Sequence, residues 1–382
     1  WKKLPKELQV AVDSRPLEGA GRVEDTINLL GHAARKIVAL ASKLTELPIE
    51  TIAQQARIPI ALYGSTKAAL DRDWSDPAQR GKALDELLTQ IDSLHVWLER
   101  RQLHEEQPLQ RYIEALGQIR AQDTERGPDG RVRIKQGVAA DRRISVEEPE
   151  MRHGRKSKSK RFNGYKQHIA TDLDTRLILA CAVTPANRPE EEATPQLKED
   201  LDAQGVRIGR LFVDRGYINS DLVEDTQSEG GEVVCKPWLV RGSRPDLFKK
   251  TDFKLNMRDN TITCPAGHLE SFEPGQVVEF DPELCGPCPL RDRCTLSASG
   301  KGRTISIADD ERLQAKLRAR QSTKRGREQL RERVGVEHRL AHIAARQGRR
   351  ARYNGLDKNL FDLRRVAAIQ NLETVQRRKS AA

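Results

Sequence analysis

The sequence predicts an α/β fold in which helices flank a mixed sheet and two insertions interrupt it, one helical and one a small zinc-binding segment. Two stretches, residues 8–13 and 208–214, are rich in apolar residues and end in an acid, which is typical of strands that end at a ligand site. Apolar residues recur at helical spacing between residues 23 and 125. Four of the six cysteines cluster between residues 264 and 294, which indicates a metal site.

Composition limits the classes of protein that the chain can belong to. Of 382 residues, 37% are hydrophobic and 32% charged, and the net charge of +11 favours polyanionic partners. No apolar run approaches the roughly 18–20 residues of a membrane span, so we expect no membrane partner. Residues 1–5 contain neither a methionine nor the apolar core of a secretory signal. We therefore expect that the N-terminal part of a longer protein is missing.

We expect five segments along the chain. They are residues 1–22 with the first core strand, 23–125 as a helical insertion, 126–230 with a hairpin, a helix and the strand of Asp214, 231–308 as a β-rich insertion with the cysteine cluster, and 309–382 as basic C-terminal helices with Glu337. The first strand covers residues 8–13 and ends at Asp13, and a turn-rich loop follows over residues 14–21. In the helical insertion, Asp76 and Pro77 mark a helix start.

A basic stretch precedes a predicted β-hairpin. Residues 121–143 are expected to be a polar linker with a turn at residues 127–130. Strands over residues 162–170 and 177–183 are then joined by a connection at residues 172–176. A solvated loop is the plain alternative for such a charge run, but its position before a hairpin favours contact with a phosphate backbone. The candidate DNA-binding residues here are Arg155, Lys156, Lys158, Lys160, Arg161 and Lys166.

The strand of residues 208–213 leads directly into Asp214. A helix over residues 190–204 precedes it, and Gly216 allows the chain to turn sharply after it. A carboxylate at such a strand end can hold a metal ion within reach of water. The alternative is an aspartate that only caps the next helix.

The clustered cysteines have the spacing of a structural zinc site. Cys285 and Cys288 form a C-x-x-C knuckle, and Cys264 and Cys294 supply the other two ligands. His268 replacing one cysteine, and free thiols, are the alternatives. The segment has few apolar residues, so we expect metal binding to supply its folding free energy. Cys181 and Cys235 lie in apolar strands and are expected to be small buried hydrophobic residues.

The last segment is helical and strongly basic. Its first apolar face consists of Val336, Leu340 and Ile343, and Glu337 lies at the edge of that face. On composition alone, Glu337 is expected to form a surface salt bridge.

Several stretches together resemble the bacterial insertion-sequence DDE transposases, whose catalytic core is ribonuclease H-like. These stretches span nearly the whole chain, at residues 11–17, 19–26, 154–158, 164–166, 212–217, 336–340 and 351–355. The resemblance implies that Asp13, Asp214 and Glu337 are the catalytic, metal-binding carboxylates, and that Arg333, Arg346 and Arg352 bind DNA.

The resemblance also implies a tyrosine–arginine–glutamate–lysine signature around the third acid. Arg333 stands four residues before Glu337, as the signature requires. Leu330 and Ala344 occupy the tyrosine and lysine positions, and Arg346 or Lys358 would replace the lysine.

A transposase of this kind uses two Mg²⁺ ions, because one can activate the attacking oxygen while the other stabilises the leaving 3′ oxygen. The implied partners are double-stranded DNA, as element ends and target, and a second copy of the chain in a homodimer. The implied location is the cytoplasm, in association with the nucleoid. Two alternatives remain, a non-catalytic zinc-containing DNA-binding remnant and a plain nuclease of the same fold.

Overall fold

The computed structural model describes residues 7–205, 207–240, 244–297 and 300–380. The chain forms two compact units. The first contains residues 1–13, 170–177 and 201–338, and the second contains residues 14–169, 178–200 and 339–382. Within the described ranges, no helix combines the length and the apolar character needed to cross a membrane.

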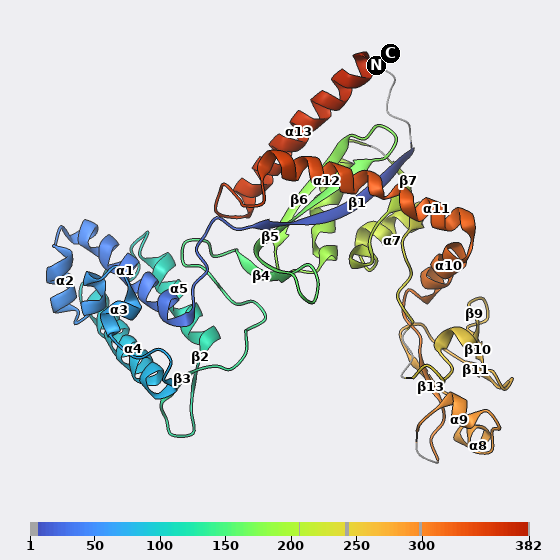
Figure 1. The fold of residues 1–382 in the computed structure, drawn as a ribbon, viewed down its shortest axis with the longest axis horizontal. Coiled ribbons are helices and arrows are strands. Elements are labelled where there is room, and N and C mark those ends of the chain that lie inside the picture. The colour runs from blue at the N-terminus through green and yellow to red at the C-terminus, as the bar shows by residue number, and fades with distance from the viewer. Residues whose placement is uncertain (1–6, 206, 241–243, 298–299, 381–382) are drawn as a thin grey trace. The chain divides into compact units, whose positions relative to one another are not determined.

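The chain forms a curled mixed sheet flanked by helices (Figure 1), which confirms the predicted α/β class. Its strands are β1 (Glu7–Glu18), β4 (Arg152–Arg155), β5 (Arg161–Asp172), β6 (Ile178–Pro185), β7 (Arg207–Phe212) and β8 (Glu232–Val234), in the order β4-β5-β1-β7-β8 with β6 paired to β5. Strands β1, β7 and β8 are parallel to one another, and β4 is antiparallel to β5. The parallel strands bury their apolar residues, among them Val10, Val12, Leu211, Phe212 and Val234.

Strand β1 is longer than its sequence pattern predicted. The turn-rich loop expected at residues 14–21 is wrong for residues 14–18, which continue the strand. Leu17 is fully buried there, and both backbone groups of Glu18 are hydrogen-bonded, to Arg349 O at 2.8 Å and from Ala351 N at 2.6 Å. Pro16 suggested a loop, but a proline is tolerated in a strand where its missing N–H faces no neighbour. Asp13 therefore lies within a strand and not at its end.

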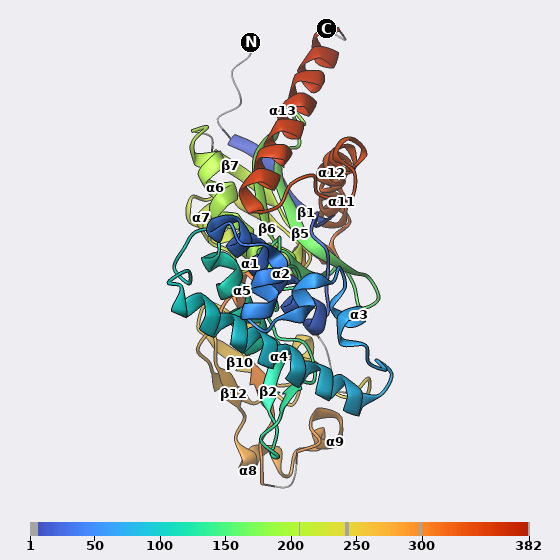
Figure 2. The ribbon, with the colours of Figure 1, turned by 90° about the vertical axis from the view of Figure 1, so that its left-hand side faces the viewer.

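The second unit contains a helical cluster with its own apolar core (Figure 2). Its helices are α1 (Thr26–Thr45), α2 (Ile49–Gln55), η1 (Pro59–Leu62), α3 (Thr66–Leu70), α4 (Pro77–Arg100) and α5 (Gln110–Asp123). The predicted start of α4 is confirmed, because the Asp76 side chain accepts a hydrogen bond from Ala78 N at 2.8 Å. The expected linker after α5 instead contains a short hairpin of β2 (Thr124–Arg126) and β3 (Val132–Ile134), which closes around the predicted turn.

The same unit contains η2 (Glu190–Ala193), α6 (Thr194–Asp202) and the long C-terminal helix α13 (Leu356–Ser380). Helix α13 packs along β6, where Asn371 forms two hydrogen bonds of 2.8 Å with the backbone of Ile178. The predicted strand pair of residues 162–183 is confirmed as β5 and β6. Strands β4 and β5 form a further hairpin, which the sequence did not predict and whose tip carries Lys156, Lys158 and Lys160.

The first unit contains η3 (Arg215–Tyr217), α7 (Asp221–Ser228) and the β-rich insertion. The insertion comprises η4 (Lys250–Asp252), β9 (Lys254–Asn256), β10 (Thr261–Thr263), β11 (Leu269–Ser271), β12 (Val277–Glu279), α8 (Pro282–Cys285), α9 (Arg291–Cys294) and β13 (Thr304–Ser306). The insertion contains a small buried apolar cluster, whose members include Phe253, Ile262, Phe272 and Phe280. Three of the cysteines pack against this cluster: Cys264, Cys285 and Cys294. The insertion thus has a small apolar core, and metal binding as the source of its folding free energy stays a prediction.

Three consecutive helices follow the insertion: α10 (Glu311–Ser322), α11 (Lys324–Glu332) and α12 (Val334–Gln347). The predicted apolar face of α12 is confirmed, since Val336, Leu340 and Ile343 are all buried. Glu311 at the start of α10 is also buried, and it is paired with Lys250 and Arg318. Burial raises the pKa of Glu311, but the hydrogen bonds from these two cations outweigh it and lower the pKa below its usual value.

Candidate active site

Two predicted carboxylates follow the paired residues of two neighbouring strands of the sheet, within the first unit. Strands β1 and β7 are parallel, and the last registered pair is Ala11 with Phe212. Asp13 stands two residues further along β1, and Asp214 stands two residues after Phe212, just beyond the end of β7. Because neighbouring strands are separated by about 4.8 Å, this register places the two aspartates on adjacent backbones.

Asp214 caps the short helix that follows it, which was one of the two expected alternatives. Its backbone is extended, and Val213 N donates to Val234 O at 3.1 Å, so the alignment with β8 persists up to Asp214. One side-chain oxygen, Oδ1, accepts a hydrogen bond from Arg215 N at 2.9 Å and caps η3. The residue is nevertheless exposed. A capping contact through one oxygen fixes the orientation of a carboxylate without burying it.

Arg333 connects the third predicted acid to the first. This residue lies at the junction between α11 and α12. Its Nη1 is 3.0 Å from Asp13 Oδ2, and its Nη2 donates to Glu337 Oε1 at 3.1 Å. The first contact is an ion pair by distance that lacks the alignment of a hydrogen bond. One guanidinium therefore contacts both carboxylates, which brings Glu337 close to Asp13.

The start of α12 is held close to the turn between β5 and β6. A Cβ atom on Gly335 would lie 2.9 Å from the side chain of Leu173. Leu173 N donates to Gln9 O at 2.8 Å, which joins this turn to β1. Side-chain exposure rises from 17% for Asp13 to 52% for Glu337. The contact with Leu173 thus positions the start of α12, and Glu337 is the more solvent-exposed of the two acids.

A buried cysteine lies close to the charged side chains of the site. Cys235 follows β8 and is buried, as predicted. Burial and, to a smaller extent, the charge of Asp214 raise the pKa of its thiol to about 12, against the opposing charges of Arg215 and Arg333. Within the described residues, no group of three or more His, Cys, Asp or Glu side chains is arranged to hold a metal ion. Metal binding by Asp13, Asp214 and Glu337 therefore remains a prediction.

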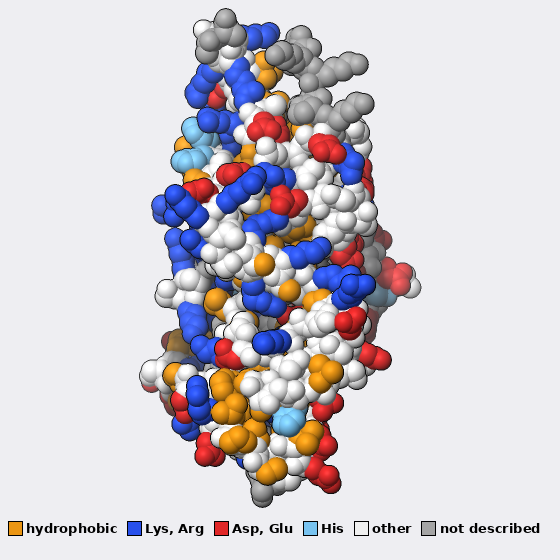
Figure 3. Space-filling view, turned by 90° about the vertical axis from the view of Figure 1, so that its right-hand side faces the viewer, with side chains coloured by type: hydrophobic (Ala, Val, Ile, Leu, Met, Phe, Trp, Pro, Cys, Tyr) orange, Lys and Arg blue, Asp and Glu red, His pale blue; other side chains and the backbone are white. Residues whose placement is uncertain are grey.

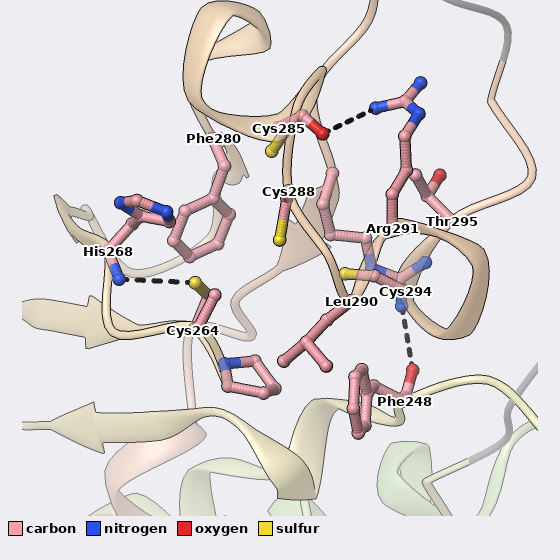
Figure 4. A pocket seen from close by; sticks show the side chains of 13 residues that line it. Phe248, Cys264, His268, Phe280, Cys285, Cys288, Leu290, Arg291, Cys294 and Thr295 are labelled. Carbon is pink, nitrogen blue, oxygen red and sulfur yellow. Dashed lines mark hydrogen bonds between the residues drawn. The ribbon is translucent and has the colours of Figure 1, made fainter.

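The four clustered cysteines line one small cavity of about 20 Å³ (Figure 4). Phe248, Phe280 and Leu290 enclose it, and His268 donates its backbone N–H to Cys264 Sγ at 3.3 Å. Burial raises the pKa of Cys294, and the other three cysteines raise it further against the opposing charge of Arg303. The thiols are therefore neighbours, although the described residues do not place them in a metal-holding arrangement.

A buried carboxylate that the sequence did not reveal lies at Glu148 in the second unit. Glu148 is fully buried and accepts hydrogen bonds from Tyr165 Oη at 2.6 Å and from Gly21 N. Tyr165 Oη also accepts from Gly355 N at 3.3 Å. Burial and the bond to Glu148 both raise the pKa of Tyr165. In sequence, Glu148 lies in an acidic run that looks solvent-exposed, so only the structure could identify it.

The predicted DNA-binding residues have different environments. Lys166 is half-buried, its Nζ donates to Arg188 O at 2.7 Å, and burial lowers its pKa. Arg346 is paired with Glu373. Figure 3 shows that Lys and Arg side chains are prominent on one face of the molecule. The exposed members of the predicted set are Arg155, Lys156, Lys158, Lys160, Arg161, Arg346 and Arg352.

Residues 133–372, well over half of the 382 in the chain, match the family model described as "Transposase DDE domain". The comparison with curated proteins and the comparison with solved structures found no match.

Proposed function

Because the chain belongs to the DDE transposase family, as its resemblance predicted, we propose that it cleaves the 3′ ends of an insertion sequence and joins them to target DNA. Membership of this family implies an enzyme of the polynucleotidyl-transferase type that binds DNA. The specific proposal is supported by the Arg333 guanidinium, which contacts both Asp13 and Glu337, and by the parallel pairing of β1 with β7, the strand that leads to Asp214.

The donor set fits divalent cations. All three side chains are carboxylates, and oxygen donors are the ligands that Mg²⁺ prefers. Bound Mg²⁺, which we propose as two ions, would supply Lewis-acid activation of water or of a 3′-OH and would stabilise the leaving oxygen. In this proposal Asp13 and Asp214 provide ligands from the rigid sheet, and the cap on Asp214 fixes its orientation. Glu337 provides the third carboxylate from the first turn of α12.

We extend the proposal to the remaining parts of the chain. The mixed sheet would be a ribonuclease H-like core, interrupted by the segments 23–125 and 231–308, and two copies would pair in the DNA complex. The basic tip of the β4–β5 hairpin would contact the phosphate backbone, because its side chains are exposed and carry the same charge. The residues proposed to bind DNA are Arg155, Lys156, Lys158, Lys160, Arg161, Lys166, Arg333, Arg346 and Arg352.

The main test uses a purified Asp214→Asn protein and an element-end DNA substrate in Mg²⁺. Cleavage should fall by about 10²–10³-fold or more, as when one group that stabilises developing charge is removed. Asp221→Asn, at an exposed acid of α7, is the matched control and should cleave normally. A folded Asp214→Asn protein that binds DNA and still cleaves would contradict the proposal.

The same assay separates the alternative functions. A plain nuclease would cleave the element end but would not join a pre-nicked end to a second duplex. A DNA-binding remnant would do neither, even with the three acids intact.

We also propose that Cys264, Cys285, Cys288 and Cys294 hold a structural Zn²⁺ ion, because all four line one small cavity. Purified protein should contain about one zinc per chain, and Cys288→Ser should release it and lower the stability of the insertion. Cys181→Ser, at a buried cysteine of β6, is the control and should retain the metal. Zinc-free protein with unchanged stability would contradict a zinc site and support free thiols.

A further inference from the structure

Arg333 lies where its positive charge is shared by two of the three proposed metal ligands. The same guanidinium is 3.0 Å from Asp13 Oδ2 and 3.1 Å from Glu337 Oε1. A divalent cation that binds both carboxylates needs those oxygens, or their immediate neighbours. Two cations that compete for the same oxygens repel each other strongly at such distances. The guanidinium cannot relieve this repulsion by losing its proton, because arginine stays charged in proteins.

We propose that Arg333 is an internal competitor of the metal ion, and that a DNA phosphate releases the site by accepting the guanidinium. This inference rests on the proposed function, since it concerns metal and DNA at the same site. Arg333 acts here as a positioning residue: it keeps Asp13 and Glu337 together while DNA is absent. Metal affinity is then low in the free protein and rises when DNA binds.

The structure supports a guanidinium that can change partners. The Arg333 side chain is 22% exposed, and its Nη1 is buried beside Asp13 without hydrogen-bond alignment, so no hydrogen bond holds it there. Its other partner, Glu337, is 52% exposed, so that contact is open to solvent. A phosphate offers the planar guanidinium two parallel charge-assisted hydrogen bonds, which match its geometry well. Replacing Asp13 and Glu337 by a phosphate therefore leaves the arginine paired and frees the two carboxylates.

Such an exchange couples the two ligands thermodynamically. If DNA raises the affinity for the metal ion, the metal ion must raise the affinity for DNA by the same factor. A merely structural Arg333 would have the opposite signature, because losing it would disorganise the carboxylates and weaken metal binding.

The test is a calorimetric titration of the full chain with Mn²⁺, with and without a short DNA duplex. Without DNA, Arg333→Gln should bind Mn²⁺ more tightly than the original chain, by a factor in the range of about 5–150 that is typical of such coupling. Adding DNA should raise the affinity of the original chain and should change that of Arg333→Gln much less. Arg331→Gln removes the same charge at an exposed position two residues away, and it should behave like the original chain.

A second variant protects the test against poor folding. Arg333→Lys keeps the charge but replaces the planar fork by a single ammonium group, so its Mn²⁺ affinity should be intermediate. Unchanged or weaker Mn²⁺ binding by both variants would overturn the competition while leaving the metal site intact, provided that Asp214→Asn still reduces binding. If the original chain bound no Mn²⁺ at all, with DNA or without it, the proposed function and this inference would both fail.

Discussion

The buried bond between Tyr165 and Glu148 gives the sharpest prediction of stability. Tyr165→Phe removes a hydroxyl that donates to Glu148 at 2.6 Å and accepts from Gly355 N at 3.3 Å. Both side chains are fully buried, so water cannot replace the lost hydroxyl without a rearrangement. A hydrogen bond to a charged group contributes about 1.5–3 kcal/mol, and a neutral one about 1 kcal/mol. We expect the free energy of unfolding to fall by about 2–4 kcal/mol.

Urea unfolding followed by circular dichroism measures this loss, because the midpoint falls with stability while the slope stays constant. Tyr353→Phe is the matched control. That tyrosine is 41% exposed, so removing its hydroxyl should change stability by less than about 0.5 kcal/mol. A loss for Tyr165→Phe no larger than that of the control would refute the reasoning.

A double-mutant cycle then assigns the effect to this pair. In a Glu148→Leu background Tyr165 has lost its acceptor, so Tyr165→Phe should destabilise the protein less than it does in the original chain. Additive effects would show that the tyrosine acts through its packing and not through the hydrogen bond.

Two further predictions concern buried ionisable groups. Burial, aided by the charge of Lys166, lowers the pKa of His168 from 6.5 to about 3, so the folded state keeps this residue neutral. As the pH drops, the unfolded chain takes up the proton first. The free energy of unfolding should therefore decrease as the pH is lowered from about 6.5 to about 3, and His168→Gln should make this decrease smaller. Glu311 has a lowered pKa, so its contribution is present above pH 4.5 and is lost on acidification below it. Glu311→Gln at pH 7 should destabilise the protein by about 3 kcal/mol, the low end for a broken buried pair because its cations are partly exposed. Urea denaturation curves measure both effects, with His104→Gln as the control for His168→Gln and Glu328→Gln as the control for Glu311→Gln. A variant that changes stability no more than its control would contradict the corresponding prediction.

The elements that the sequence predicted well depend on local patterns. The cap of α4 at Asp76 needs only the residues that immediately follow it. The apolar face of α12 repeats within one helix, and the hairpin of β5 and β6 closes over a short connection. In each case the residues that determine the element lie within a few helical turns or within one pair of strands.

The elements that the sequence missed depend on partners far away in the chain. Residues 14–18 continue β1 because Glu18 binds the backbone of residues 349 and 351, and no local signal reports that pairing. The role of Glu148 depends on Gly21 and Tyr165, which are 127 and 17 residues distant. Arg333 was predicted as part of a signature, but its contact with Asp13 spans most of the chain and could only come from the structure.

The stretches that carry the family resemblance involve two kinds of acid: a structural one, and acids that could bind a metal ion. The hydrogen-bond and ion-pair partners of each acid distinguish the two kinds. Gly21, Tyr165 and Gly355 come from three of those stretches, and all are joined directly or indirectly to Glu148. Both oxygens of Glu148 accept from neutral donors in a site without solvent, so a cation there would leave buried donors unsatisfied. Asp13 and Glu337 instead face a half-buried guanidinium, which an incoming cation can replace without leaving a neutral donor unpaired. An acid in a family stretch is not enough to indicate a metal site. The Arg333 guanidinium is a cation that a metal ion could replace, and this favours metal binding at Asp13 and Glu337 over binding at Glu148.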